Sequence, residues 1–361
     1  MFKKIFERVL TEAIKCGFIQ AEAVFIDATH IKANANKKKY IKKMARHQVH
    51  KYKRDLLLEI NEDRLAHGKS PFEEDDIEED DQEDNNDGND NLLEDGDKPT
   101  TNSKERIVIE SKTDPESGMF YKNEKEKCFA YTVTTACDRN KFILGLKAAP
   151  GNVHDSQVFS DVFQKIIAKH PETEAIVVDA GYKIPAICRE IIKAGKDPIM
   201  PYKRPMTAKG YFKKHEYVYD EYYDCYICPN NQILSYSTTN RHGYREYKSD
   251  PAICRNCPKR IQCTRSKNFT KVVTCHIWEP YLERAEDLRH TQRGKELYRK
   301  RGETIERVFA DAKEKHGMCY TQLRGLKKVS RYLTLLFACI NLKKLAIWKQ
   351  RMGMLQRFPY K

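Results

Sequence analysis

The stretch Ala23-Val24-Phe25-Ile26-Asp27 is a short apolar run that ends in an aspartate, and Ile176-Val177-Val178-Asp179 repeats this pattern. Runs rich in β-branched and aromatic residues indicate buried strands. In α/β sheets, the side chains at the carboxyl ends of strands line the functional crevice. We therefore expect Asp27 and Asp179 to lie in such a crevice, where carboxylate oxygens can bind Mg²⁺.

The elements around these two runs alternate between strand and helix patterns. This order predicts an α/β fold with a mixed sheet flanked by helices on both faces. Residues 37–67 are a basic stretch, for which we expect a helix. Further helices are expected at 1–17, 155–169, 184–194 and 328–349, and strands at 23–33, 128–137, 142–149, 175–178 and 198–202. The turn Asp138-Arg139-Asn140-Lys141 predicts a hairpin.

A third acidic residue, Glu306, lies beside an apolar helical stripe formed by Ile305, Val308, Phe309 and Ala312. This placement brings the Glu306 carboxylate to the edge of a packed helix face. Two aspartates and a glutamate suit a two-metal site for phosphoryl transfer. For each residue taken singly, a surface or capping carboxylate is the alternative interpretation.

The formal net charge of the 361-residue chain is +14, but this average hides a strongly acidic segment. Residues 73–97 contain fifteen acidic side chains and no Lys or Arg, which leaves +29 on the other 336 residues. The acidic segment is predicted to be a disordered linker, with DNA mimicry as the alternative. The basic remainder indicates a polyanionic partner such as nucleic acid.

The hydrophobic pattern argues against membrane and secreted classes. The longest apolar run, residues 333–342, is interrupted by Thr334 and Asn341, so it predicts a buried helix instead of a membrane span. The first residues, Met1-Phe2-Lys3-Lys4, lack the apolar core of a signal peptide. We therefore expect a cytoplasmic protein without membrane contacts.

Twelve cysteines in a reducing compartment favour metal ligands over disulfides. Two Cys-x2-Cys pairs stand out in residues 206–280, a stretch otherwise rich in tyrosine and turn signals. Cys225, Cys228, Cys254 and Cys257 could form a structural zinc site, with Cys263 as an alternative ligand and free thiols as the alternative state. We expect a β-rich, cysteine-containing insertion here.

Four blocks of the sequence together resemble the DDE transposases of bacterial insertion sequences. The blocks are residues 24–36 (VFIDATHIKANAN), 149–156 (APGNVHDS), 177–182 (VVDAGY) and 305–309 (IERVF) with 324–326 (RGL). The group named for insertion sequence 1182, whose members carry a cysteine-bearing insertion, is the most similar. The resemblance extends from about residue 21 to residue 345.

This resemblance implies an RNase H-like catalytic domain in which Asp27, Asp179 and Glu306 bind two Mg²⁺ (or Mn²⁺) ions. It further implies DNA cleavage and strand transfer, transposon ends and target DNA as partners, and a homodimer on DNA near the nucleoid. Glu303 competes with Glu306 for the glutamate position. Members usually have a helical region before the first aspartate, and only 26 residues precede Asp27 here, so we expect a shortened copy.

Related transposases have a Tyr, Arg, Glu, Lys signature around the glutamate, which Tyr298, Arg301, Glu306 and Lys313 would fill. The interval from Arg301 to Glu306 is one residue longer than usual, and a helix that starts after Gly302 would absorb it. Arg299 is the alternative phosphate contact. For all these cations, an exposed helical charge is the alternative interpretation.

Three more residues, Asn152, His154 and Asp155, lie between a strand and a helix. We expect Asp155 or Ser156 to be the N-cap of that helix. His154 is either a metal ligand or proton shuttle, or an ordinary histidine of the turn.

The sequence thus divides into six parts. They are an N-terminal helix (1–20), the first core strand with a basic helix (21–72), the acidic insertion (73–100), the continued core (101–205), the cysteine-rich insertion (206–280) and the C-terminal helices with Glu306 (281–350). A protein that only binds DNA, and a nuclease that cuts without joining, are the alternative functions.

Overall fold

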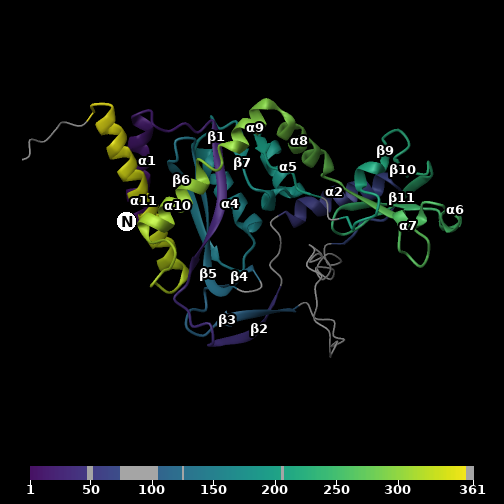
Figure 1. Ribbon diagram of the computed structural model, residues 1–361, viewed down its shortest axis with the longest axis horizontal. Helices are drawn as coiled ribbons and strands as arrows, with labels where there is room; N and C mark the ends of the chain where they lie inside the picture. The colour runs from purple at the N-terminus through teal and green to yellow at the C-terminus, as the bar shows by residue number, and fades with distance from the viewer. Residues whose placement is uncertain (47–51, 74–104, 124–125, 205–206, 355–361) are drawn as a thin grey trace, which may run out of the picture. The chain divides into compact units, whose positions relative to one another are not determined.

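A computed structural model describes residues 1–46, 52–73, 105–123, 126–204 and 207–354. The chain folds as two compact units (Figure 1). The first unit consists of Met1–Ala45, Ile107–Tyr202 and Tyr281–Lys361, and the second of Arg46–Arg106 and Lys203–Pro280. The acidic segment predicted at residues 73–97 lies, apart from Glu73, outside the described residues.

A mixed sheet forms the centre of the first unit. Its strand order is β2-β3-β4-β5-β1-β7-β8, and β6 pairs with β5. β1 is antiparallel to β5 and parallel to β7, and β7 is parallel to β8. The bounds of the strands are β1 (Ala23–Lys32), β2 (Tyr40–Arg46), β3 (Glu105–Ser111), β4 (Gly118–Asn123), β5 (Glu126–Cys137), β6 (Ile143–Pro150), β7 (Ala175–Val177) and β8 (Asp197–Ile199).

Helices flank this sheet, which confirms the predicted α/β class. Helix α4 packs on β5 and β6, α11 packs on β6 and on α1, and α10 packs on β1. In Figure 1, α1 and α11 run side by side although they come from opposite ends of the chain. The bounds are α1 (Phe2–Lys15), α4 (Asp155–Lys169), α5 (Pro185–Lys193), α8 (Glu279–His290), α9 (Gln292–Arg299), α10 (Ile305–His316) and α11 (Leu326–Arg351).

The apolar runs 23–26 and 176–178 form the middle of the core. Val24, Phe25, Ile26 and the three residues of β7 have no exposed surface, because helices cover this part of the sheet. Burial of such side chains contributes about 1.5–3 kcal/mol each. The core therefore fixes β1 and β7 as parallel neighbours.

A buried asparagine ties α11 to the sheet. Both polar atoms of the Asn341 side chain bond to the backbone of Ile143 on β6, since Oδ1 accepts from its N–H at 2.9 Å and Nδ2 donates to its carbonyl at 2.8 Å. Asn341, whose side chain is fully buried, thus supplies the backbone partners that the edge strand would otherwise lack.

The second unit is a smaller antiparallel sheet with the order β13-β12-β11-β10-β9. Its small core cluster is mostly aromatic, with Tyr217, Tyr226, Leu234, Tyr247 and Val273. The elements are β9 (Val218–Asp220), β10 (Cys225–Ile227), β11 (Ile233–Thr239), β12 (Tyr244–Ser249), β13 (Val272–His276), α2 (Lys53–Ala66), α6 (Pro251–Arg255) and α7 (Arg260–Cys263).

The prediction of one basic helix over residues 37–67 is wrong in its first part. Residues Tyr40–Arg46 form β2, and the helix α2 begins only at Lys53. The helix lies on the second sheet, where the Asp63 carboxylate accepts from Thr239 Oγ1 at 2.5 Å and from Arg245 Nε at 2.8 Å. Thr239 and Arg245 follow Asp63 by 176 and 182 residues in the sequence, so local periodicity could not reveal these contacts.

The N-cap of α4 also differs from the prediction. His154, not Asp155 or Ser156, is the capping residue, and its Nδ1 accepts from the Ser156 backbone N–H. The same nitrogen lies 2.7 Å from Ser156 Oγ. An imidazole nitrogen here takes the place of the usual capping oxygen, which gives His154 a structural function.

Candidate active site

The register of β1 and β7 places two aspartates at equivalent positions. Phe25 pairs with Val177 in the parallel ladder, so Asp27 and Asp179 each follow their pair by two residues. Side chains two residues apart point to the same face of a strand. Asp27 lies within β1, and Asp179 is the residue before the short 3₁₀ helix Ala180–Tyr182. The sheet thus brings two carboxylates from distant parts of the chain to one region.

Glu306 reaches the same region from α10. Ile305, Val308, Phe309 and Ala312 are buried, as the apolar stripe predicts, and they face β1. Glu306 is the second residue of the helix, so its carboxylate lies beside the packed face, with 53% of its side chain exposed. Glu303 lies in the turn before α10 and is exposed.

The guanidinium of Arg301 gathers the three carboxylates. Its Nη2 lies 2.5 Å from Asp27 Oδ2, and its Nη1 lies 2.7 Å from Glu306 Oε1 and 3.8 Å from Asp179 Oδ1. The Arg301 side chain is only 9% exposed, and its buried Nε has no hydrogen-bond partner among the residues that the structure describes. The positive guanidinium therefore lies among three carboxylates, whose oxygens are also suitable ligands for hard metal cations.

A turn absorbs the extra residue between Arg301 and Glu306. Helix α9 ends at Arg299 and α10 begins at Ile305. Within the turn, the Arg301 carbonyl accepts from the N–H of Thr304 at 3.2 Å and from the N–H of Glu306 at 3.3 Å. The longer interval therefore leaves the Arg301 side chain directed at the carboxylates, while Arg299 at the end of α9 is exposed.

Two more residues of the predicted signature reach this region. The Tyr298 hydroxyl lies 3.5 Å from Asp179 Oδ1. Burial raises the pKa of Tyr298, and the charge of Asp179 raises it further. Lys313 Nζ donates to Thr29 Oγ1 at 2.6 Å, and Thr29 follows Asp27 by two residues on the same strand face. The structure therefore brings Tyr298, Arg301, Glu306 and Lys313 toward one face of β1.

The comparison with known families covers the second half of this arrangement. Residues 227–346, a third of the chain, match the family model of the transposase DDE domain. The match confirms the resemblance to DDE transposases. The transposase DDE domain match includes Tyr298, Arg301, Glu306 and Lys313 and leaves out Asp27 and Asp179. A search of curated proteins finds no match.

The donor set agrees with the divalent metals that DDE transposases generally use. Carboxylate oxygens are the ligands that Mg²⁺ prefers. The Arg301 guanidinium supplies positive charge among the three carboxylates. In the described part of the chain, no group of three or more His, Cys, Asp or Glu side chains is already arranged to hold a metal ion. The carboxylates are arranged around the guanidinium instead.

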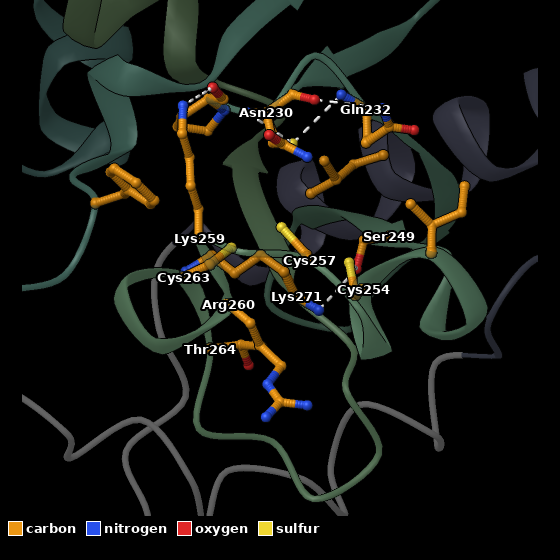
Figure 2. A pocket seen from close by; sticks show the side chains of 15 residues that line it. Asn230, Gln232, Ser249, Cys254, Cys257, Lys259, Arg260, Cys263, Thr264 and Lys271 are labelled. Carbon is orange, nitrogen blue, oxygen red and sulfur yellow. Dashed lines mark hydrogen bonds between the residues drawn. The ribbon is translucent and has the colours of Figure 1, made fainter.

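Four cysteines of the second unit line one pocket, and the set differs from the predicted one. Cys228, Cys254, Cys257 and Cys263 line it, whereas Cys225 does not (Figure 2). Cys225 lies in β10 and is buried, and Cys228 follows it by three residues. Cys228 lies beyond the end of β10 at Ile227, at the start of the turn that lines the pocket. The sequence signal for Cys263 was its position six residues after Cys257.

The thiols of this pocket share one electrostatic environment. Burial raises the pKa of Cys263, the Tyr217 hydroxyl and Lys271 lower it, and Cys228 and Cys254 raise it again. The Tyr217 hydroxyl is 3.2 Å from Cys263 Sγ. Cys228 and Cys254 therefore lie close enough to Cys263 to disfavour its ionisation.

No helix in the described residues is long and apolar enough to cross a membrane.

Proposed function

We propose that this protein is a DDE transposase that cleaves DNA and joins the freed 3′ end to a target, with Asp27, Asp179 and Glu306 as its metal-binding carboxylates. The convergence of these three side chains on Arg301 carries the proposal. Support also comes from the strand order β6-β5-β1-β7-β8, which suits an RNase H-like core, and from the transposase DDE domain match.

In this proposal, Asp27, Asp179 and Glu306 would hold two Mg²⁺ or Mn²⁺ ions. Such ions, when bound, stabilise the attacking and leaving oxygens of an in-line phosphoryl displacement. The half-buried position of Asp27 on β1 restricts the orientation of its carboxylate. Glu306, on a helix packed against the same strand, holds the opposite side of the cluster.

The cations of the site would act on the DNA backbone. Arg301 carries a planar fork of donors suited to phosphate oxygens, and Lys313 provides a second positive charge beside Thr29. Tyr298 would hold Asp179 in place through its hydroxyl. Arg299 and other exposed cations would contact phosphates farther from the reaction.

Strand transfer with purified protein tests this function. The substrate is DNA from the ends of the parent element, with Mg²⁺ or Mn²⁺ present. We expect nicking and joining by the wild type, and loss of both by a factor of at least about 10³ in Asp27→Asn, Asp179→Asn and Glu306→Gln, since each removes a charged ligand. Glu303→Gln is the matched control, because it makes the same change in the exposed turn and should keep full activity.

The outcomes separate the alternative functions. Cutting without joining identifies a nuclease, and binding without either reaction identifies a DNA-binding protein. Equal cleavage by wild type and all three variants would rule out the assignment of these carboxylates.

A further inference from the structure

Four cysteines of the second unit share a pocket that no part of the proposed DNA chemistry uses. They come from the turn after β10 (Cys228), from α6 (Cys254), from the segment between the two short helices (Cys257) and from α7 (Cys263). Figure 2 shows the last three side chains directed toward the middle of the pocket. Thiolates in a set of four are the preferred ligands of structural Zn²⁺.

The backbone around Cys228 positions its sulfur. Its Sγ accepts from the N–H of Asn230 at 3.3 Å and from the N–H of Gln232 at 3.4 Å. The Cys228 carbonyl also accepts from Asn231 N–H, which closes a tight turn in which Asn231 has a positive φ of 53°. Two backbone donors thus hold this sulfur in place at the edge of the pocket.

Positive side chains line the same pocket. Lys259, Arg260 and Lys271 are the three cations. Four thiolates around one Zn²⁺ carry a net charge of −2, and these cations offset it. The segment from residue 251 to residue 271 contains six Lys and Arg and no Asp or Glu. Around a neutral pocket, these cations would repel each other without any acidic residue to offset them. Around an anionic metal cluster, the same cations are stabilising.

The elements that carry the thiols are too short to be stable alone. Helix α6 has five residues and α7 has four, whereas isolated helices below about 12 residues are marginal in water. The nearby core cluster has two aliphatic members, Leu234 and Val273, and otherwise tyrosines. A metal cross-link would supply the stability that this segment lacks, as it does in small zinc domains.

We propose that Cys228, Cys254, Cys257 and Cys263 bind one structural Zn²⁺ ion, and that Cys225 and Cys275 are not ligands. The thiols are not yet in a ready-made metal geometry, so the ion draws them inward as it binds. Each ligand loses its proton on binding. The ion fastens α6 and α7 to the turn after β10.

Zinc content tests the ligand set directly. The full-length protein, purified with zinc present and then freed of excess metal, is subjected to elemental analysis. We expect about one zinc per chain in the wild type, near zero in Cys228→Ser, Cys257→Ser and Cys263→Ser, and an unchanged content in Cys225→Ser and Cys275→Ser. A wild type without zinc, or a loss on Cys225→Ser with retention on Cys263→Ser, overturns the proposal.

Two further measurements guard against variants that fail to fold. Cys263→His replaces one zinc ligand by another and should keep the ion. Cobalt(II) titrated into metal-free wild type should produce the intense thiolate-to-cobalt absorption, and its absence contradicts four thiolate ligands. Since neither measurement uses DNA, failure of the zinc site is distinguishable from failure of the transposase function.

Discussion

At the scale of the residue, Arg301 decides how the three carboxylates can coexist. The nearly buried guanidinium lies within 4 Å of all three. Removal of this cation would leave three carboxylates that repel each other, although Asp179 and Glu306 are about half exposed to solvent. Arg301 is therefore as important for the shape of the site as for any contact with DNA.

We predict that Arg301→Ala lowers the free energy of unfolding by about 2 kcal/mol in metal-free buffer. Added Mg²⁺ should stabilise this variant more than the wild type, because the Arg301 guanidinium no longer competes with the ion for the carboxylates. Urea denaturation with and without Mg²⁺ measures both effects. Arg299→Ala, an exposed change of the same kind, should match the wild type, and equal Mg²⁺ stabilisation of all three proteins would contradict the role given to Arg301.

A second residue-scale prediction concerns pH. Burial raises the pKa of Asp138 to about 6, although its carboxylate accepts from the N–H of Gln20 and Phe142 and lies near Lys344. In the unfolded chain the pKa is near 3.8. Below about pH 4 the group is protonated in both states. As the pH rises from about 4 through 6, the Asp138 carboxyl ionises more readily in the unfolded chain than in its buried position in the folded state. The free energy of unfolding therefore falls by about 3 kcal/mol.

The variant Asp138→Asn cannot ionise and isolates this effect. We expect the unfolding free energy of the wild type, relative to that of Asp138→Asn, to fall between pH 4 and pH 7. Denaturation at several pH values provides the measurement. A difference that stays constant over this range would show that the Asp138 carboxyl titrates normally.

At the scale of the element, α11 depends on one polar side chain within an apolar helix. Asn341→Leu would leave the N–H and carbonyl of Ile143 without partners at a buried strand edge. We predict a loss of about 2–4 kcal/mol, since each unsatisfied group costs about 1–3 kcal/mol. Chemical denaturation measures it, with Leu342→Ala on the half-exposed neighbouring position as the control. A loss below that of the control would show that water replaces the Asn341 contacts.

The elements that sequence patterns predicted well are those whose burial is regular along the chain. β1, β5, β6, β7, α4, α5, α10 and α11 lie within a few residues of their expected bounds. Their apolar periodicity results from packing on one continuous core, so it is visible locally. β2 was mistaken for helix because its partner β3 follows some 60 residues later.

In the candidate sites too, local sequence patterns predict some features but not those that depend on distant or irregular segments. That Asp27 and Asp179 lie together follows from two apolar runs and the parallel register between them. The position of Arg301 between the carboxylates depends on the conformation of the turn between α9 and α10. The residue types in this turn do not by themselves predict that conformation. Cys225 was predicted as a ligand from its Cys-x2-Cys spacing, and the structure places it in a strand and not among the residues that line the pocket.

At the scale of the whole molecule, the net charge of +14 combines a basic protein with one acidic segment. We predict that deletion of residues 74–97 tightens non-specific DNA binding at low salt and steepens its salt dependence, because more counterions are then released. The deletion should begin after Glu73. Phe72 must remain, since its backbone exchanges two hydrogen bonds with the Asn61 side chain in α2.

Binding to random DNA at several salt concentrations measures this effect. A shuffled segment that keeps the same acidic residues is the matched control, and it should behave as the wild type. Thermal unfolding of the deletion protein should be unchanged. Loss of the folded state would show that these residues belong to a folded part of the chain.

The division of the chain between two units has a consequence for the order of synthesis. α2 leaves the ribosome long before β11 and β12, which supply the partners of Asp63. Asp27 emerges early, whereas Arg301 and Glu306 follow only after the entire second unit. At about 5–20 residues per second, a nascent chain spends many seconds with the first aspartate exposed and no glutamate to complete the cluster. An unfinished chain therefore lacks the assembled cluster of carboxylates on which the proposed function depends.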